Sequence, residues 1–151
     1  MLAKYVRAVD HVDGQTMGDL FAASGKVEVF YNNGRIWDLL FMLSGKNAIA
    51  NAVSSWMQLQ PKRGWSHHTT YDLIIEVKGD AASIDVQFVR FDSLGDKRPK
   101  AGWPANTAGV TGVVSAAEYG YYRPTLKNIN EEWKIEKLQI IHELPFAIPG
   151  Q

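Results

Sequence analysis

The chain has 151 residues, a length that suits one domain with its own core, and we expect a single domain over residues 1–151. Its 16 basic and 16 acidic side chains cancel, which argues against nucleic acid or an anionic membrane surface as a partner. Without a cysteine, the chain forms no disulfide, thiolate metal site or cysteine nucleophile.

The start of the chain does not resemble a signal peptide. Asp10, Asp13 and Asp19 interrupt the apolar residues of the first 23 positions, and no later apolar run is long enough to span a bilayer. We therefore expect a soluble, cytoplasmic protein.

Two short helices are predicted first. Residues 2–10 place their apolar side chains on one helical face. Asp13 stands at the N-cap position of a second helix, which we expect to end near Ser24-Gly25.

A hairpin and a third helix follow. Residues 26–31 alternate apolar and polar side chains, Asn32-Asn33-Gly34 indicates a turn, and residues 35–43 can return as the partner strand. Ser44 is predicted to cap a helix over residues 45–59.

Long strands dominate the rest. Residues 64–91 predict a hairpin that turns at Lys78-Gly79-Asp80. Residues 92–111 are rich in glycine and proline and predict an irregular surface excursion. Residues 111–126 and 132–144 predict two further strands, joined by a turn at 128–130, and a tail at 145–151 ends with a Pro149-Gly150 turn. Helices followed by antiparallel strands favour an α+β fold with a strongly curved sheet.

Several segments together resemble the SnoaL-like proteins of the nuclear transport factor 2-like superfamily. Residues 5–13 with Leu20-Phe21 are similar to the opening of that family, and residues 44–49 to the start of its third helix. His67-His68-Thr69 resembles its histidine-bearing strand, and residues 122–135 its closing strands.

The resemblance implies a cone-shaped α+β barrel of the cystatin-like type, in which a curved mixed sheet wraps around the N-terminal helices and encloses a deep pocket. It also implies a homodimer. Members include ketosteroid isomerase, scytalone dehydratase, bile-acid dehydratase, a dehydrochlorinase, polyketide cyclases and the non-catalytic small subunits of ring-hydroxylating dioxygenases.

In the dehydratase branch, an Asp late in the first helix orients a strand His that removes a proton from the substrate. The matching positions here are Asp10 and His68, which we take as the catalytic candidates. Asp13 is an alternative to Asp10, although its position predicts a helix cap.

The choice between the adjacent histidines stays open. On a regular strand His67, rather than His68, lies on the side of Leu73, Ile75 and Val77. His68 joins that side only if a bulge intervenes, or else the pocket lies on the other face.

Candidate substrate-binding residues are mostly aromatic, since such side chains suit an apolar cavity, but the same residues are also typical of plain core. They are Tyr5, Trp37, Phe41, Trp56, His67, Phe88 and Tyr119. Because adjacent strand histidines diverge, we predict no metal site, and no cofactor-binding motif is found in the sequence.

Two features depart from the family. Ala22-Ala23-Ser24-Gly25 stands where many relatives carry an acidic residue, and the excursion at 92–109, with Trp103, suggests a lid or a dimer arm.

The sequence thus favours a cofactor-independent lyase or isomerase, of the dehydratase or cyclase type, acting on a small hydrophobic molecule. The alternative is a non-catalytic ligand-binding protein or a small (beta) subunit of a ring-hydroxylating dioxygenase.

Overall fold

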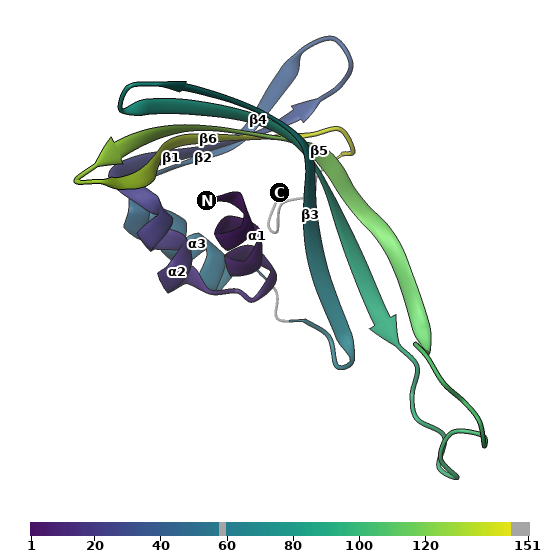
Figure 1. Ribbon diagram of the computed structural model, residues 1–151. Coiled ribbons are helices and arrows are strands. Elements are labelled where there is room, and N and C mark those ends of the chain that lie inside the picture. Colours follow the sequence, from purple (N-terminus) through teal and green to yellow (C-terminus); the bar gives the residue numbers. More distant parts are fainter. Residues whose placement is uncertain (58–59, 146–151) are drawn as a thin grey trace.

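A computed structural model describes residues 1–57 and 60–145 of the chain, in which three helices lie against one six-stranded sheet (Figure 1). The sheet bends strongly, and the helices occupy its concave side (Figure 1). The predicted turn at Pro149-Gly150 falls outside the described residues. The predicted continuation of the third helix to Leu59 is wrong, because the helix ends at Trp56 and Met57 already has an extended backbone.

The helical layer consists of α1 (Leu2–Asp10), α2 (Gly14–Leu20) and α3 (Lys46–Trp56). As predicted, Asp13 caps α2, and its side chain accepts a hydrogen bond from the Thr16 backbone N–H. The predicted end of this helix near Ser24-Gly25 is wrong. Phe21 already has an extended backbone, because its buried ring and its pairing with Ile135 place it in the sheet.

The predicted Ser44 cap is also wrong. Ser44 is the last residue of a strand and pairs with Lys26, so the N-cap of α3 is Gly45. Gly45 has a φ of 88°, a value that glycine adopts without strain.

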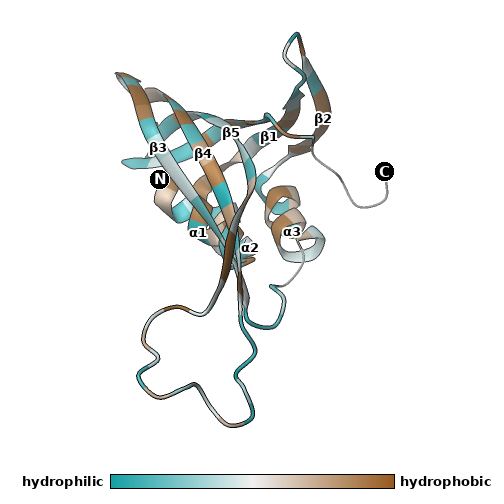
Figure 2. Ribbon diagram, turned by 90° about the vertical axis from the view of Figure 1, so that its right-hand side faces the viewer, coloured by the Kyte–Doolittle hydropathy of each residue, from teal (hydrophilic) through white to brown (hydrophobic). Residues whose placement is uncertain are grey.

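The strands, in chain order, are β1 (Phe21–Asn32), β2 (Trp37–Ser44), β3 (Gly64–Lys78), β4 (Ala81–Gly95), β5 (Gly112–Ile129) and β6 (Glu132–His142). Their order in the sheet is β2-β1-β6-β5-β4-β3. β1 runs parallel to β6 and every other neighbouring pair is antiparallel, so the sheet is mixed and the predicted α+β class is confirmed. Hydropathy alternates along the first part of β4, as expected for a strand with one inward face (Figure 2).

The hairpins follow their turn signals with small shifts. β3 and β4 meet at Lys78 and Ala81, as Lys78-Gly79-Asp80 predicted. The last turn falls later than predicted, because Ile129 still pairs with Glu132. Asn130 and Glu131 therefore form the two-residue loop, and both have a positive φ, as in a type I′ turn.

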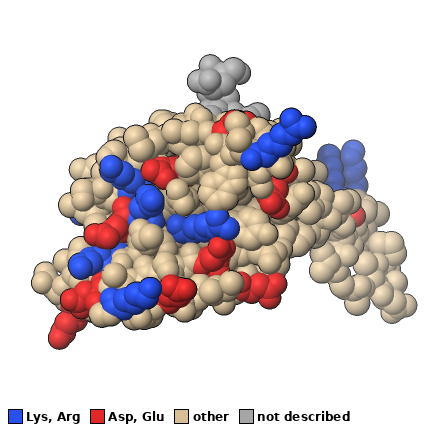
Figure 3. All heavy atoms as spheres, turned by 90° about the horizontal axis from the view of Figure 1, so that it is seen from above, with Lys and Arg blue, Asp and Glu red and all other residues tan. Residues whose placement is uncertain are grey.

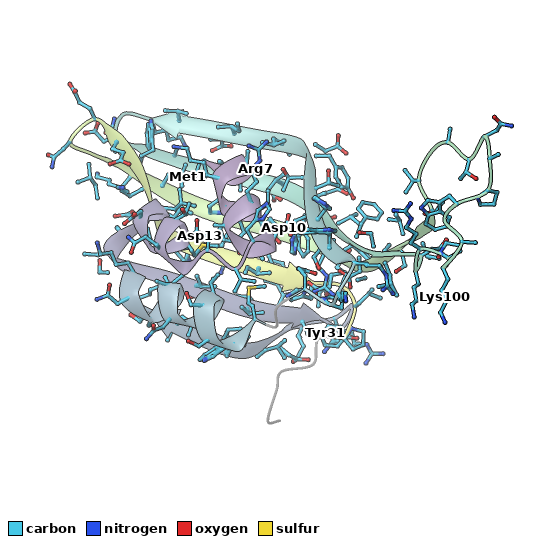
Figure 4. The ribbon with its side chains drawn as sticks, turned by 90° about the horizontal axis from the view of Figure 1, so that it is seen from below. Met1, Arg7, Asp10, Asp13, Tyr31 and Lys100 are labelled. Carbon is cyan, nitrogen blue, oxygen red and sulfur yellow. The ribbon has the colours of Figure 1, made fainter. Side chains whose placement is uncertain are left out.

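The predicted excursion is shorter than its glycine and proline content suggested. β4 and β5 remain paired as far as Gly95 and Gly112, so only residues 96–111 are irregular. This loop leads away from the helices, and Lys100 within it lies far from Asp10 (Figures 1 and 4). The loop therefore does not cover the Asp10 end of the concave side.

The core lies between the helices and the concave face and occupies part of that space. Phe88 of β4 is fully buried and stacks on Tyr122 of β5, with ring centroids 4.1 Å apart. Tyr5 of α1 meets Tyr122 edge to face at 5.3 Å. These contacts fix α1 against β4 and β5 through aromatic pairs, each worth about 1 kcal/mol beyond area burial. The outer face, in contrast, carries interspersed basic and acidic side chains (Figure 3).

Candidate functional site

His68 is directed inward because β3 is irregular. The register shifts between Tyr71 and Ile74, and Asp72 there has a φ of 55°. Before the bulge Thr70 pairs with the buried Phe88, and after it Ile75 pairs with the buried Ile84. Residues paired across antiparallel strands share a face, so His68, two residues before Thr70, lies on the same side as Ile75. The bulge thus resolves the alternative left by the sequence, and His67 is exposed on the other face.

Asp10, the last residue of α1, contacts His68 of β3, and both residues line the same cavity. Asp10 Oδ1 lies 2.6 Å from His68 Nδ1, and the backbone N–H of His68 donates to the same carboxylate at 3.0 Å and 3.2 Å. The two side chains are only 6% and 5% exposed. This geometry holds the imidazole in one orientation, since both partners sit on rigid elements.

The turn after α1 orients Asp10. The backbone N–H groups of Val12 and Asp13 donate to the carbonyls of Val9 and Ala8, which is the pattern of a Schellman motif. Val12 takes the left-handed position usually occupied by glycine, with a φ of 56°. The motif directs Asp13 away from the cavity, where it is exposed and its hydrogen bonds with Thr16 lower its pKa.

A cavity of about 890 Å³ lies between the helices and the concave sheet. One end is apolar and is lined by α3, β1 and β2, whereas the other end holds Asp10 and His68. The volume suits a drug-sized or smaller organic molecule.

Five of the nine residues predicted for the site line this cavity: Tyr5, Asp10, Phe41, Trp56 and His68. The other four do not appear among its described lining residues. Phe88 lies behind the wall, where its ring centroid is 6.1 Å from that of His68. Trp37 packs against Phe30, and the guanidinium carbon of Arg123 lies over the Trp37 ring, 5.0 Å from its centroid.

His67 and Tyr119 belong to the outer face. His67 is adjacent to the inward His68, and Tyr119 pairs with Val89, next to the inward Phe88. Alternation along a strand directs both away from the cavity.

A second polar cluster was not predicted from the sequence. Arg90 of β4 donates through Nη1 to Glu118 of β5 and through Nη2 to Asp92 at 3.1 Å. His142, the last residue of β6, places Nδ1 at 3.7 Å from Glu118 Oε2. All four residues line the cavity. The only signal in the sequence was the polar character of these strand positions, and their shared face depends on the register of three strands.

Burial controls protonation at this end of the cavity. It lowers the pKa of His142 to about 4, with smaller contributions from the nearby charges of His68 and Arg90. Burial also raises the pKa of Tyr5, as does the Glu118 carboxylate, and it raises that of Tyr122. At neutral pH, His142 is therefore uncharged and both tyrosines keep their protons.

Within the described part of the chain, no three His, Asp or Glu side chains are grouped so as to hold a metal ion. None of the helices in residues 1–57 and 60–145 is long and apolar enough to cross a membrane.

The helices, the mixed sheet and the cavity between them define the nuclear transport factor 2-like, or cystatin-like, class of α+β folds. The profile of the SnoaL-like domain matches residues 1–139, and the chain belongs to this family. A search of curated proteins found no match.

Similar solved structures include three from Novosphingobium aromaticivorans. The beta subunit of a proposed aromatic-ring-hydroxylating dioxygenase is 15% identical, with a TM-score of 0.69 over 97% of this chain and 87% of that one. A nuclear transport factor 2-like protein with a cystatin-like fold is 17% identical, with a TM-score of 0.64 over 97% and 79%. A proposed scytalone dehydratase is 14% identical, with a TM-score of 0.60 over 99% and 89%. At such identities the likeness shows the fold alone.

Proposed function

We propose that the protein is a cofactor-independent lyase or isomerase in which His68 removes a proton from a small hydrophobic substrate. The observation that carries the proposal is the 2.6 Å contact between His68 Nδ1 and Asp10 Oδ1 beside a large cavity. The similarity to a proposed scytalone dehydratase supports a dehydratase-type reaction.

Asp10 selects the tautomer of His68. A carboxylate can only accept hydrogen bonds, so the imidazole proton sits on Nδ1 and leaves the Nε2 lone pair for the substrate. When Nε2 takes a proton, the imidazolium is stabilised by Asp10 and by the negative end of α1, where Asp10 is the last residue. Asp10 therefore acts as a positioning and charge-stabilising group rather than as a base.

In a dehydration, the electrons of the broken C–H bond form the new double bond and the C–O bond breaks. His68 then returns its proton to the departing oxygen, so that water leaves and the enzyme is restored. Tyr5 lines the same end of the cavity, and its raised pKa keeps its hydroxyl protonated. It is suited to donate a hydrogen bond to a substrate oxygen on which negative charge develops.

Exchange of the benzylic α-hydrogens of 2-tetralone into D2O, followed by NMR, tests the proton-transfer step with an uncharged hydrophobic probe. We expect the wild-type protein to accelerate this exchange. The Asp10→Asn variant presents an amide N–H to Nδ1, which moves the imidazole proton to Nε2 and removes the base. We expect the catalysed exchange to fall by about 10²–10⁴-fold in this variant.

Asp13→Asn is the matched control. It makes the same chemical change three residues later, at an exposed helix cap outside the large cavity, where asparagine caps as well as aspartate. This variant should exchange at the wild-type rate. If Asp10→Asn also did so while remaining folded, the proposal would fail. That result would favour a non-catalytic role, which the similarity to a dioxygenase beta subunit also supports.

A further inference from the structure

The charges that line the cavity are unequal. Among its described lining residues, Asp10, Asp92 and Glu118 carry carboxylates, whereas Arg90 alone carries a guanidinium or ammonium group. His142 adds no positive charge at neutral pH, since burial lowers its pKa to about 4. The polar end of the cavity therefore has an excess of formal negative charge.

Arg90 is already paired with two of these carboxylates. Nη1 donates to Glu118 and Nη2 donates to Asp92. Nε is buried and has no hydrogen-bond partner among the described residues. Both Nη atoms of the guanidinium thus already donate to carboxylates, and Nε is buried.

The sheet itself holds this cluster in place. Arg90 and Glu118 are directly paired across β4 and β5, and Asp92 is two residues from Arg90 on the same face. The hydroxyl of Ser66, on β3, donates to the second oxygen of Asp92 at 2.7 Å. An anionic ligand that approached Arg90 would therefore lie next to two carboxylates that already share its positive charge.

We infer that the Arg90–Glu118–Asp92 cluster makes the cavity select uncharged substrates over anionic ones, although its apolar walls would accept either. An added anion would meet a cluster with a formal charge of −1 in surroundings that screen charge poorly. The inference rests on the proposed function in one respect, namely that this cavity is the substrate site. It narrows the substrate class to uncharged hydrophobic molecules, which excludes carboxylates, sulfonates and phosphates.

Two fluorescent probes of similar shape test this selection. N-phenyl-1-naphthylamine is uncharged, and 8-anilino-1-naphthalenesulfonate adds one anionic group to the same skeleton. At pH 7 we expect the wild-type protein to bind the uncharged probe with a Kd at least about tenfold lower. The Ala117→Trp variant, which fills the cavity from β5, should abolish the fluorescence of both probes and so locate them.

Removing one carboxylate from the cluster should relax the selection. Glu118→Gln, with Asp92→Asn as a second variant, should lower the Kd of the sulfonate at least about fivefold and change that of the uncharged probe less than twofold. Asp85→Asn is the control, because Asp85 pairs with Arg123 at 2.9 Å outside the cavity lining. It removes the same charge from the same kind of pair and should change neither Kd.

Equal wild-type affinities for the two probes within the cavity would overturn the inference, and so would an absence of binding by the uncharged probe. Unchanged sulfonate affinity in both folded cluster variants would overturn it as well. The exchange of 2-tetralone separates this result from the proposed function, since that probe is uncharged. Asp10-dependent exchange combined with equal probe affinities would defeat the inference alone.

Discussion

The cavity holds two buried histidines, and their surroundings suit them to different tasks. His68 lies 2.6 Å from Asp10, whereas His142 lies 3.7 Å from Glu118, beyond hydrogen-bonding distance. The carboxylate of Glu118 is also held by Arg90, and the pKa of His142 is lowered mainly by burial, with smaller contributions from His68 and Arg90. His68 therefore has a carboxylate within hydrogen-bonding distance, whereas Glu118 is farther from His142 and is shared with Arg90.

The largest expected difference between the two histidines is in proton exchange. His68→Gln should reduce the catalysed exchange of 2-tetralone by about 10³-fold, because it removes the proposed base. His142→Gln should reduce it by less than about tenfold, since His142 lines the cavity but has no part in the proposed proton transfer. NMR measurement of both variants at pH 7 tests the assignment, and similar losses in the two would break it.

A second difference is in the pH dependence of stability. In the folded protein the pKa of His142 is about 4, compared with an ordinary value of 6.5. Between these values the unfolded chain binds the proton more readily, so this group's stabilising contribution is complete above pH 6.5 and is lost as pH falls towards 4. The loss is about 3 kcal/mol in the free energy of unfolding.

Urea denaturation between pH 7 and pH 4 measures this contribution. His142→Gln should fall less steeply than the wild-type protein by about 3 kcal/mol over that range. The control is His11→Gln, which removes an exposed histidine and should leave the wild-type slope unchanged. Parallel curves for the wild-type protein and His142→Gln would show that burial does not suppress the charge of His142.

The elements with strong local signals were predictable from the sequence. The amphipathic pattern of α1, the Asp13 cap and the Lys78-Gly79-Asp80 turn all depend on neighbouring residues, and the structure contains each of them. The pairing of Asp10 with His68 was expected from the family resemblance, because no spacing rule joins residues 58 positions apart.

The remaining features depend on strand register. The bulge at Asp72, which decides between His67 and His68, occurs without a glycine or proline to indicate it. The cluster of Arg90 with Glu118 requires the pairing of β4 with β5, and a shift of one residue would direct Glu118 outward. Such long-range pairings are set by tertiary packing, which a local pattern does not contain.

The smallest expected effect concerns the turn that follows Asp10, the partner of His68. Val12 has a positive φ, which costs an L-residue about 1–2 kcal/mol, whereas glycine is the usual residue at this position of a Schellman motif. Val12→Gly should therefore raise the free energy of unfolding by up to about 1 kcal/mol, the gain being limited by the greater chain entropy of glycine in the unfolded state.

Val114→Gly provides the matched control for urea denaturation, because Val114 is exposed in β5, where the backbone is extended. The same substitution there should destabilise the protein by about 0.5–1 kcal/mol, so the two variants should differ in sign. Destabilisation by both would mean that the partly buried side chain of Val12, which lines the cavity, outweighs its backbone strain. Since Asp10 is held independently by three contacts with His68, the exchange rate of Val12→Gly should stay within about threefold of wild type.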